Sequence, residues 1–293
     1  MTLTITATRI SPSPDKLGES PIWDDRLGRL YWVDSFSRLI RFLDYGKDVV
    51  QSLEMPSMIG SIALCRDSGQ LIAGLADGIY LVNLADGALD PVYVPEPANA
   101  RVRFNDGKVD RQGRFVCGTM GVFAEPEGQL VRVSAGGGAE CLATGIRISN
   151  SICFSPDGGT FYFADSLDRA IRAYHYTADA EPLTEPRIHV DTRPYHSGPD
   201  GATVDSEGFI WVSLVQAGKI GRFAPDGSLD RVISAPVDMP SCVTFGGPDM
   251  SILYMTSIKD SGSGRAISRH PYGGYLFALE GLGVTGIPEP LYG

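Results

Sequence analysis

Six copies of one short pattern, spaced evenly along the chain, constrain the fold more than any other feature of the sequence. Each copy is a polar turn followed by a run of β-branched or aromatic residues, as in Asp25–Val33, Asp110–Val116 and Asp205–Val212. A turn of this kind between apolar runs is typical of a β-hairpin. The apolar residue after each turn recurs about every 45 residues, at Leu30, Leu71, Phe115, Phe161, Ile210 and Leu253. The chain is therefore expected to consist of six similar β-units.

Each unit contains room for two more strands after its hairpin. The predicted third strands are Arg38–Leu43, Gly78–Leu84, Gln129–Val133, Ala170–Tyr176, Lys219–Phe223 and Gly274–Leu279, and weaker fourth strands follow, for example Val49–Leu53 and Arg231–Ser234. Four strands in about 45 residues is the pattern of a propeller blade. An open β-sandwich, the alternative all-β fold, does not usually show six regular repeats. The sequence thus predicts an all-β, six-bladed β-propeller around a central tunnel, forming a single domain over residues 1–293.

The first residues of the chain are predicted to close this ring. Thr2–Arg9 alternates like a strand and is expected to pair with the last blade, because an open ring would leave unpaired strand edges. The many turns agree with the composition, since 35 Gly and 20 Pro occur among the 293 residues.

Charge and cysteine usage exclude several classes of partner and location. The 35 acidic residues outnumber the 25 basic ones, which gives a net charge of −10 that would repel nucleic acid or an anionic membrane. We expect no signal peptide in Met1–Ile10 and no transmembrane helix. The five cysteines are odd in number and lack a CxxC spacing, so we expect buried, reduced thiols in a cytoplasmic protein. The sequence makes no prediction of the oligomeric state.

The repeat register also predicts a site on the propeller axis. The innermost strand of each blade begins at one rim of the tunnel, 10 or 11 residues before each apolar anchor. These positions are Glu19, Gly60/Ser61, Asn105, Asn150, Asp200 and Cys242. Four of them carry side-chain oxygens, which are ligands for Ca²⁺, Mg²⁺ or Mn²⁺. Two converging carboxylates would repel each other unless a cation neutralised them, so we expect a divalent ion; the alternative is that these side chains cap strands or bind tunnel water.

Further candidates lie on the same rim. The loops after the second strands should flank the axis, and the long loops Met120–Gly128 and Ser257–Gly273 are expected to shape substrate access. Arg103 precedes Asn105, and Tyr195 and His196 precede Asp200, so each could meet a polar substrate. The four histidines do not cluster in the sequence, which gives little support to a Ser-His-Asp triad.

Longer motifs around these positions resemble those of the gluconolactonase/regucalcin family, also called the senescence marker protein family. The motifs are Leu17–Trp23 (LGESPIW), Arg103–Asp110 (RFNDGKVD), Ser149–Asn150 with Ser155–Gly158 (SPDG), Pro199–Gly201 (PDG), Phe245–Asp249 (FGGPD) and Gly273–Leu279 (GGYLFAL). They extend over essentially the whole chain. The resemblance implies a six-bladed propeller with one catalytic divalent ion (Ca²⁺, Mn²⁺, Mg²⁺ or Zn²⁺) held by Glu19, Asn150 and Asp200. It further implies that Arg103 and Asn105 bind substrate and that Asp200 is the general base.

The reaction that the resemblance implies is the metal-dependent opening of a sugar-derived lactone, an aldonolactone, to its acid. The enzyme would be a carboxylic ester hydrolase of carbohydrate metabolism whose partner is a small-molecule lactone. Two alternatives stay open: a hydrolase of an apolar lactone, aryl ester or phosphotriester at the same metal site, and a non-catalytic propeller that binds a metal or a protein partner. The sequence differs from the family at Ser151, where Gly is frequent, and at Gly121–Ala124, where an acidic residue is frequent. This apolar loop favours the first alternative.

Overall fold

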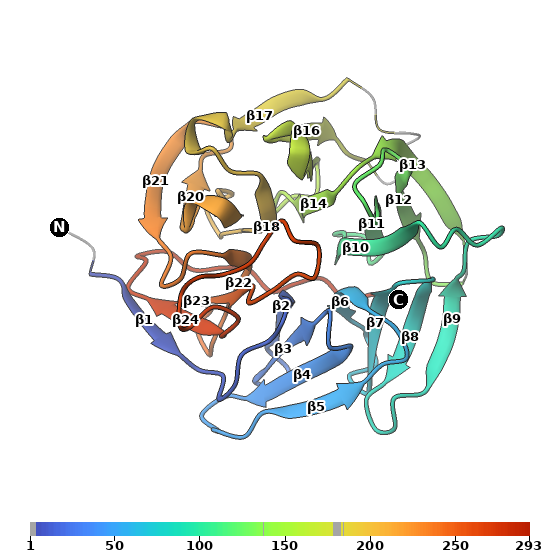
Figure 1. Ribbon diagram of the computed structural model, residues 1–293, viewed down its shortest axis with the longest axis horizontal. Coiled ribbons are helices and arrows are strands. Elements are labelled where there is room, and N and C mark those ends of the chain that lie inside the picture. The colour runs from blue at the N-terminus through green and yellow to red at the C-terminus, as the bar shows by residue number, and fades with distance from the viewer. Residues whose placement is uncertain (1–3, 137, 178–182, 184) are drawn as a thin grey trace.

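The computed structural model describes residues 4–136, 138–177, 183 and 185–293 and is a six-bladed β-propeller (Figure 1). In these residues, 24 strands form six four-stranded antiparallel sheets that stand around a central axis. The first three blades are β2–β5 (Gly18–Asp24, Arg29–Asp34, Leu39–Asp44, Gln51–Glu54), β6–β9 (Ile59–Leu64, Gln70–Leu75, Ile79–Asn83, Leu89–Tyr93) and β10–β13 (Val102–Val109, Phe115–Gly121, Gly128–Val133, Ala139–Ile146). The predicted fold class is confirmed.

The remaining three blades follow the same order from the axis outward. They are β14–β17 (Ser149–Phe154, Thr160–Asp165, Ala170–His175, Arg187–Asp191), β18–β21 (Pro199–Val204, Ile210–Leu214, Lys219–Phe223, Leu229–Ser234) and β22–β24 (Pro240–Gly246, Ile252–Ser257, Phe277–Glu280) with β1 (Thr6–Arg9). The only helices in the described residues are three short 3₁₀ turns, η1 (Ser166–Asp168), η2 (Arg193–Tyr195) and η3 (Val215–Ala217). None of them could cross a membrane.

The sixth blade is completed by the start of the chain, as the sequence predicts. Strand β1 pairs antiparallel with β24, from Thr6 opposite Glu280 to Arg9 opposite Phe277. The Ile10 N–H continues this ladder by donating to the Leu276 carbonyl over 2.9 Å. The predicted strand began at Thr2, and residues 2 and 3 lie outside the described part of the chain. Closure in this way joins the first and last blades through backbone hydrogen bonds.

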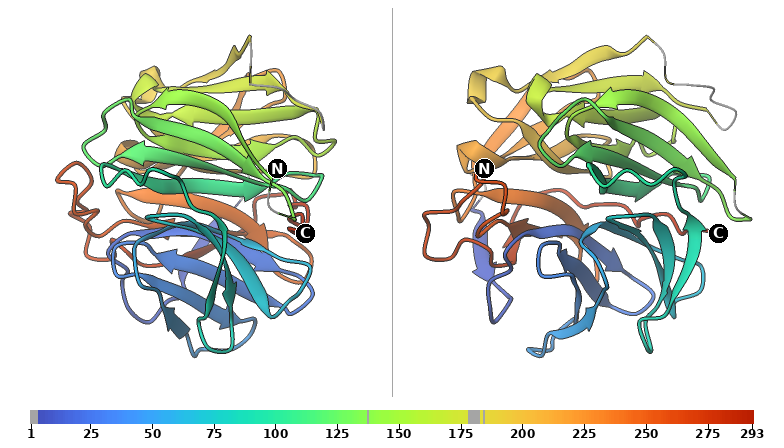
Figure 2. Two further views of the ribbon diagram at one scale, coloured as in Figure 1. Left: turned by 90° about the vertical axis from the view of Figure 1, so that its right-hand side faces the viewer. Right: turned by 45° about the vertical axis from the view of Figure 1, so that its right-hand side comes forward.

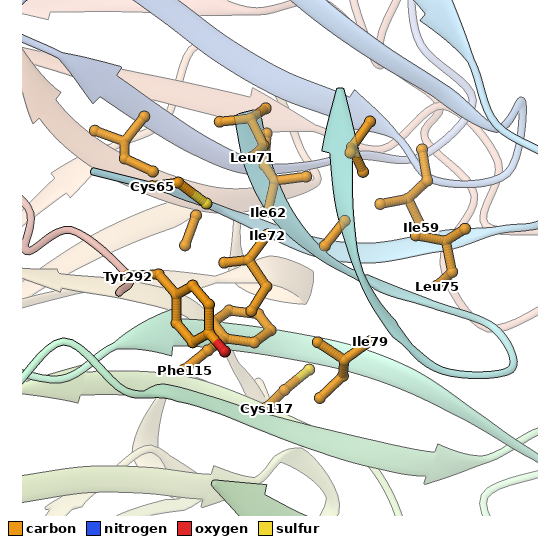
Figure 3. Packing of buried hydrophobic residues seen from close by; sticks show 14 of the residues in the cluster. Ile59, Ile62, Cys65, Leu71, Ile72, Leu75, Ile79, Phe115, Cys117 and Tyr292 are labelled. Carbon is orange, nitrogen blue, oxygen red and sulfur yellow. The ribbon is translucent and has the colours of Figure 1, made fainter. Parts of the chain in front are cut away.

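The outermost strand is the most exposed strand of each blade. Strands β6, β14, β18 and β22 are buried at every residue because neighbouring blades cover both of their faces, whereas β5 is largely exposed. Figure 3 shows the packing between the second and third blades, where Ile62, Leu71 and Phe115 meet in one apolar cluster. Of the five free cysteines, four are buried as expected, but Cys141 is exposed because β13 is an outermost strand.

The C-terminal segment crosses the rim opposite the predicted site. Gly286 pairs with Asp205 at the end of β18, and Tyr292 pairs with Cys65 at the end of β6. The Tyr292 ring packs into the cluster of Figure 3 beside Phe115. Between these two anchors, the Glu289 carboxylate reaches the Lys108 ammonium at 2.9 Å. Both side chains are at most 15% exposed, so this ion pair is shielded from water and holds the segment over the tunnel end.

Replacing Glu289 by Gln should destabilise the propeller by about 3 kcal/mol, because it leaves the Lys108 charge buried without its partner. The free energy of unfolding, measured in urea, checks this expectation. The matched control is Glu54→Gln, which breaks the exposed pair with Arg38 and should cost less than about 1 kcal/mol. Equal losses in the two variants would contradict the shielded role of the Lys108–Glu289 pair.

Candidate metal and catalytic site

The residues that the repeat register singles out all lie where the innermost strands begin, at one rim of the tunnel. Glu19, Asn150 and Asp200 are each the second residue of an innermost strand, in β2, β14 and β18. Asn105 lies in β10 between them in the order of blades. The innermost strands of neighbouring blades contact each other all around the axis (Figure 1). Residues far apart in sequence are therefore brought to the same rim. The two remaining ring positions hold Gly60 and Cys242.

A break in strand register lies at each ring position or directly after it. The six breaks fall between Glu19 and Ile22, Ile59 and Ser61, Phe104 and Gly107, Asn150 and Cys153, Pro199 and Ala202, and Pro240 and Val243. A bulge of this kind bends a strand and changes the direction of its side chains. The repeated bulge therefore lets consecutive residues of an innermost strand face the axis.

Two of these bulges contain serines in the left-handed backbone region. Ser20 has φ 48° and Ser151 has φ 56°, a conformation that costs a non-glycine residue about 1 kcal/mol or more. Each hydroxyl makes a bond to the neighbouring blade. The Ser20 hydroxyl accepts from the Ile62 N–H at 2.9 Å, and the Ser151 hydroxyl donates to the Asp200 carbonyl at 2.5 Å. These bonds tie the segments that follow Glu19 and Asn150 to adjacent innermost strands.

Hydrogen bonds join three of the predicted site residues into one network. The Arg103 Nη1 donates to Asn105 Oδ1 at 2.8 Å and to the Phe104 carbonyl at 2.9 Å. The Asn105 Nδ2 in turn donates to Asn150 Oδ1 at 3.1 Å. The Asn150 Nδ2 donates to the Ser166 hydroxyl in η1 at 2.8 Å. Since both ends of the Asn150 amide are engaged, its orientation is fixed, and Oδ1 keeps a lone pair for another partner.

The carboxyl groups of the site lie in an environment that disfavours their charge. Burial, followed by repulsion from Asp200 and Asp106, raises the pKa of Glu19 well above its usual range. Burial and the charge of Asp106 raise the pKa of Asp200 as well. Burial lowers the pKa of the Arg103 guanidinium to about 10, and Glu19 opposes this shift. An added cation would stabilise both carboxylates in their charged forms.

Asp106 belongs to this cluster, although the sequence analysis did not find it. Its Oδ2 accepts from the Ile152 N–H of β14 at 2.8 Å, and burial raises its pKa to about 6. Regular strand alternation would turn Asp106 away from the axis if Asn105 faces it. The bulge between Phe104 and Gly107 removes that alternation. The sequence signals are that Asp106 directly follows a ring position and lies within the motif Arg103–Asp110.

The donor set of the ring fits a hard divalent cation. Within the described residues, no group of three or more His, Cys, Asp or Glu side chains is placed to hold a metal ion. Glu19 and Asp200 instead combine two carboxylates with the amide oxygen of Asn150, and such oxygen donors suit Ca²⁺, Mg²⁺ or Mn²⁺. Burial raises the pKa of both carboxyl groups, and a bound cation would favour their charged forms.

The rim loops lie where the repeat register places them. Two candidate side chains on that rim, His196 and Tyr195, do not join the site network. The second strands end beside the starts of the innermost strands, as Leu75 does opposite Ile59 and Gly121 opposite Val102. The loops that follow therefore surround the site. His196 caps the 3₁₀ turn η2 and is exposed. The Tyr195 ring packs edge-on against the Phe223 ring. Neither residue joins the hydrogen-bond network around Asn150.

Fold and site together define the class of protein. The chain matches the family described as SMP-30/Gluconolactonase/LRE-like region over residues 17–259 and belongs to it, which confirms the resemblance seen in the motifs. It is 35% identical to 6-deoxy-6-sulfogluconolactonase of Pseudomonas putida over 281 residues, covering 95% of this chain and 96% of that one. It is 32% identical to regucalcin of Gallus gallus, with 93% of each chain covered. Lactone hydrolysis is thus supported by the family's sugar lactonases.

A solved structure shows the same architecture. The calcium-binding protein regucalcin from Agrobacterium tumefaciens superposes with a TM-score of 0.89 at 28% identity, covering 99% of this chain and 98% of that chain. The agreement over nearly the full length of both chains extends to all six blades. The closed ring of six blades is therefore a fold that the two proteins share.

Ser151→Ala should destabilise the folded protein by about 1–2 kcal/mol, because the Asp200 carbonyl loses a buried hydrogen-bond donor. Unfolding in urea without added metal measures this cost. Ser52→Ala, on the exposed outer strand β5, is the control and should change stability by less than about 0.5 kcal/mol. A Ser151→Ala protein as stable as the control would show that the bond between blades contributes nothing.

Proposed function

We propose that this protein is a metal-dependent lactonase that opens a sugar-derived lactone, an aldonolactone, to its hydroxy acid. Membership in the family supports the reaction class. The observation that supports the ion is that Glu19, Asn150 and Asp200 each lie at the start of a buried innermost strand, where burial raises the pKa of both carboxyl groups. The free thiols support a reducing compartment such as the cytoplasm as the place of this activity.

Glu19, Asn150 and Asp200 would hold the divalent ion. When bound, such an ion supplies Lewis-acid polarisation of the lactone carbonyl and stabilises the negative charge that develops on its oxygen. Ca²⁺ is the first candidate because a structural relative is described as a calcium-binding protein, and Mn²⁺, Mg²⁺ and Zn²⁺ remain in the test. The Asn105 amide and the Arg103 guanidinium lie beside the ligand set and would bind the polar edge of the substrate.

The remaining steps fall to side chains of this chain. The Asp200 carboxylate would accept a proton from the attacking water as its oxygen adds to the carbonyl carbon. The ring C–O bond then breaks, and the same proton passes to the departing alkoxide to give the hydroxyl of the product. Water and lactone are thereby converted to one hydroxy acid without any other reactant.

Asp200→Ala should lower kcat/KM for aldonolactones at least about 100-fold, because it removes both the proposed base and one carboxylate of the ion site. Acid release from an aldonolactone panel measures the rate, and calorimetry with single metal ions measures ion binding. Chelation of the unaltered protein should abolish activity, and one of the four ions should restore it.

The control variant is Asp249→Ala, which removes an exposed carboxylate from the turn between β22 and β23 on the opposite rim. It should keep full activity and ion affinity. Full activity of the Asp200→Ala variant, or of the chelated protein, would contradict the proposed metal-dependent mechanism. An inert protein that still binds the ion would instead support the non-catalytic alternative.

One observation favours a second candidate, a hydrolase of an apolar lactone, aryl ester or phosphotriester at the same site. In the loop after β11, Val122 is 43% exposed and Phe123 is 71% exposed, on the rim that surrounds the ring site. Apolar side chains left in water at the mouth of a site are suited to an apolar substrate. Adding apolar lactones, aryl esters and phosphotriesters to the acid-release panel separates the two candidates.

A further inference from the structure

A cavity of about 570 Å³ opens on the rim of the ring site, between the second and third blades. Its walls come from the starts of β6 and β10, the ends of β7 and β11, and the segment 95–100 that joins β9 to β10. Sites for small molecules commonly have volumes of about 300–1,000 Å³. The cavity is therefore large enough for a substrate group, and it does not coincide with the ion ligands.

Arg103 connects this cavity to the ring site. The residue lines the cavity, while its Nη1 bonds Asn105, whose amide bonds the proposed ion ligand Asn150. Arg103 thus links the cavity wall to the hydrogen-bond network around Asn150. A lactone whose carbonyl lies at the ion ligands could extend past Arg103 into the cavity without crossing a blade.

The lining of the cavity specifies the chemistry of what it can hold. Most of the wall is apolar, including Met58, Pro95, Pro97, Val102, Phe104 and Val122. Its ionisable lining residues are Asp77, Glu127 and Arg103, and the Arg103 guanidinium is already engaged by Asn105 and the Phe104 carbonyl. The Glu127 carboxylate is paired with the Arg101 guanidinium at 3.1 Å, so Asp77 is the carboxylate of the wall that would repel an anionic group. The apolar wall favours a hydrocarbon.

We propose that this cavity is the subsite for a neutral aliphatic substituent on the lactone, so that the preferred substrates carry an uncharged hydrocarbon group remote from the carbonyl. The proposal rests on the lactone hydrolysis proposed above and, of its two candidate substrate classes, favours the apolar lactone over the aldonolactone. It also distinguishes this chain from its Pseudomonas relative, whose name describes a lactone carrying a sulfo group. A sulfonate or phosphate at the remote end would meet the Asp77 carboxylate.

The first test compares δ-lactones that differ only in their alkyl substituent. The kcat/KM of the ion-loaded protein should be at least about tenfold higher for δ-decalactone, which carries a pentyl group, than for unsubstituted δ-valerolactone. Ala98 lines the cavity from the segment 95–100, and Ala98→Trp should fill the space and abolish this preference. Ala85→Trp places the same side chain in the exposed turn between β8 and β9, on the opposite rim, and should preserve it.

The second test concerns charge. The unaltered protein should open 6-phosphogluconolactone at least about tenfold less efficiently than gluconolactone. Asp77→Lys should narrow this difference severalfold by reversing one charge of the wall, whereas Asp86→Lys, in the turn between β8 and β9, should leave it unchanged.

The outcomes separate this proposal from the proposed function. If aldonolactones are opened but the pentyl group gives no advantage, or Ala98→Trp and Ala85→Trp behave alike, the subsite is wrong while the lactonase stands. If no lactone is opened, calorimetry of δ-decalactone with Asp200→Ala decides: binding that Ala98→Trp abolishes supports the subsite without the hydrolysis, and absence of binding overturns the subsite as well.

Discussion

Antiparallel pairing of β1 with β24 is the interaction on which the geometry of the site depends. It joins the first residues of the chain to the last blade, so that the six sheets form a closed ring. Only in a closed ring do the starts of all innermost strands meet around one axis. Glu19 in the first blade and Asp200 in the fifth then become close enough for the charge of one to raise the pKa of the other's carboxyl group.

The repeat made much of this arrangement predictable from sequence. Six evenly spaced hairpins specify the number of blades, and equal counting within each repeat specifies the rim positions Glu19, Asn105, Asn150 and Asp200. Counting back from the apolar anchor of each repeat identifies these positions because the propeller symmetry places equivalent residues of all blades at the same rim, whatever their side chains are. The division of these residues into ion ligands and substrate contacts came from the family resemblance and stays a prediction.

What the repeat cannot predict are the places where the chain departs from regular geometry. Asp106 faces the carboxylate cluster because β10 contains a bulge, and alternation would have directed it elsewhere. Ser166 orients Asn150 from a loop, and Glu289 reaches Lys108 from a tail that belongs to no blade. Such contacts join segments with no repeated spacing, and their partners can be identified only once the blades are in place.

The proposed ion site and the proposed substrate selectivity consequently lie in different parts of the fold. The axis positions lie on buried strands, where the neighbouring blades fix both the backbone and the side chains, so the proposed ion site has little freedom to vary. The proposed subsite is built largely from the segment 95–100 and the loop containing Val122. These residues are mostly exposed and therefore contribute little to the packing of the core. Substitutions in these loops can alter the cavity wall without replacing any residue of the Arg103–Asn105–Asn150 network. A propeller of this kind can therefore keep one reaction while its preferred lactone changes.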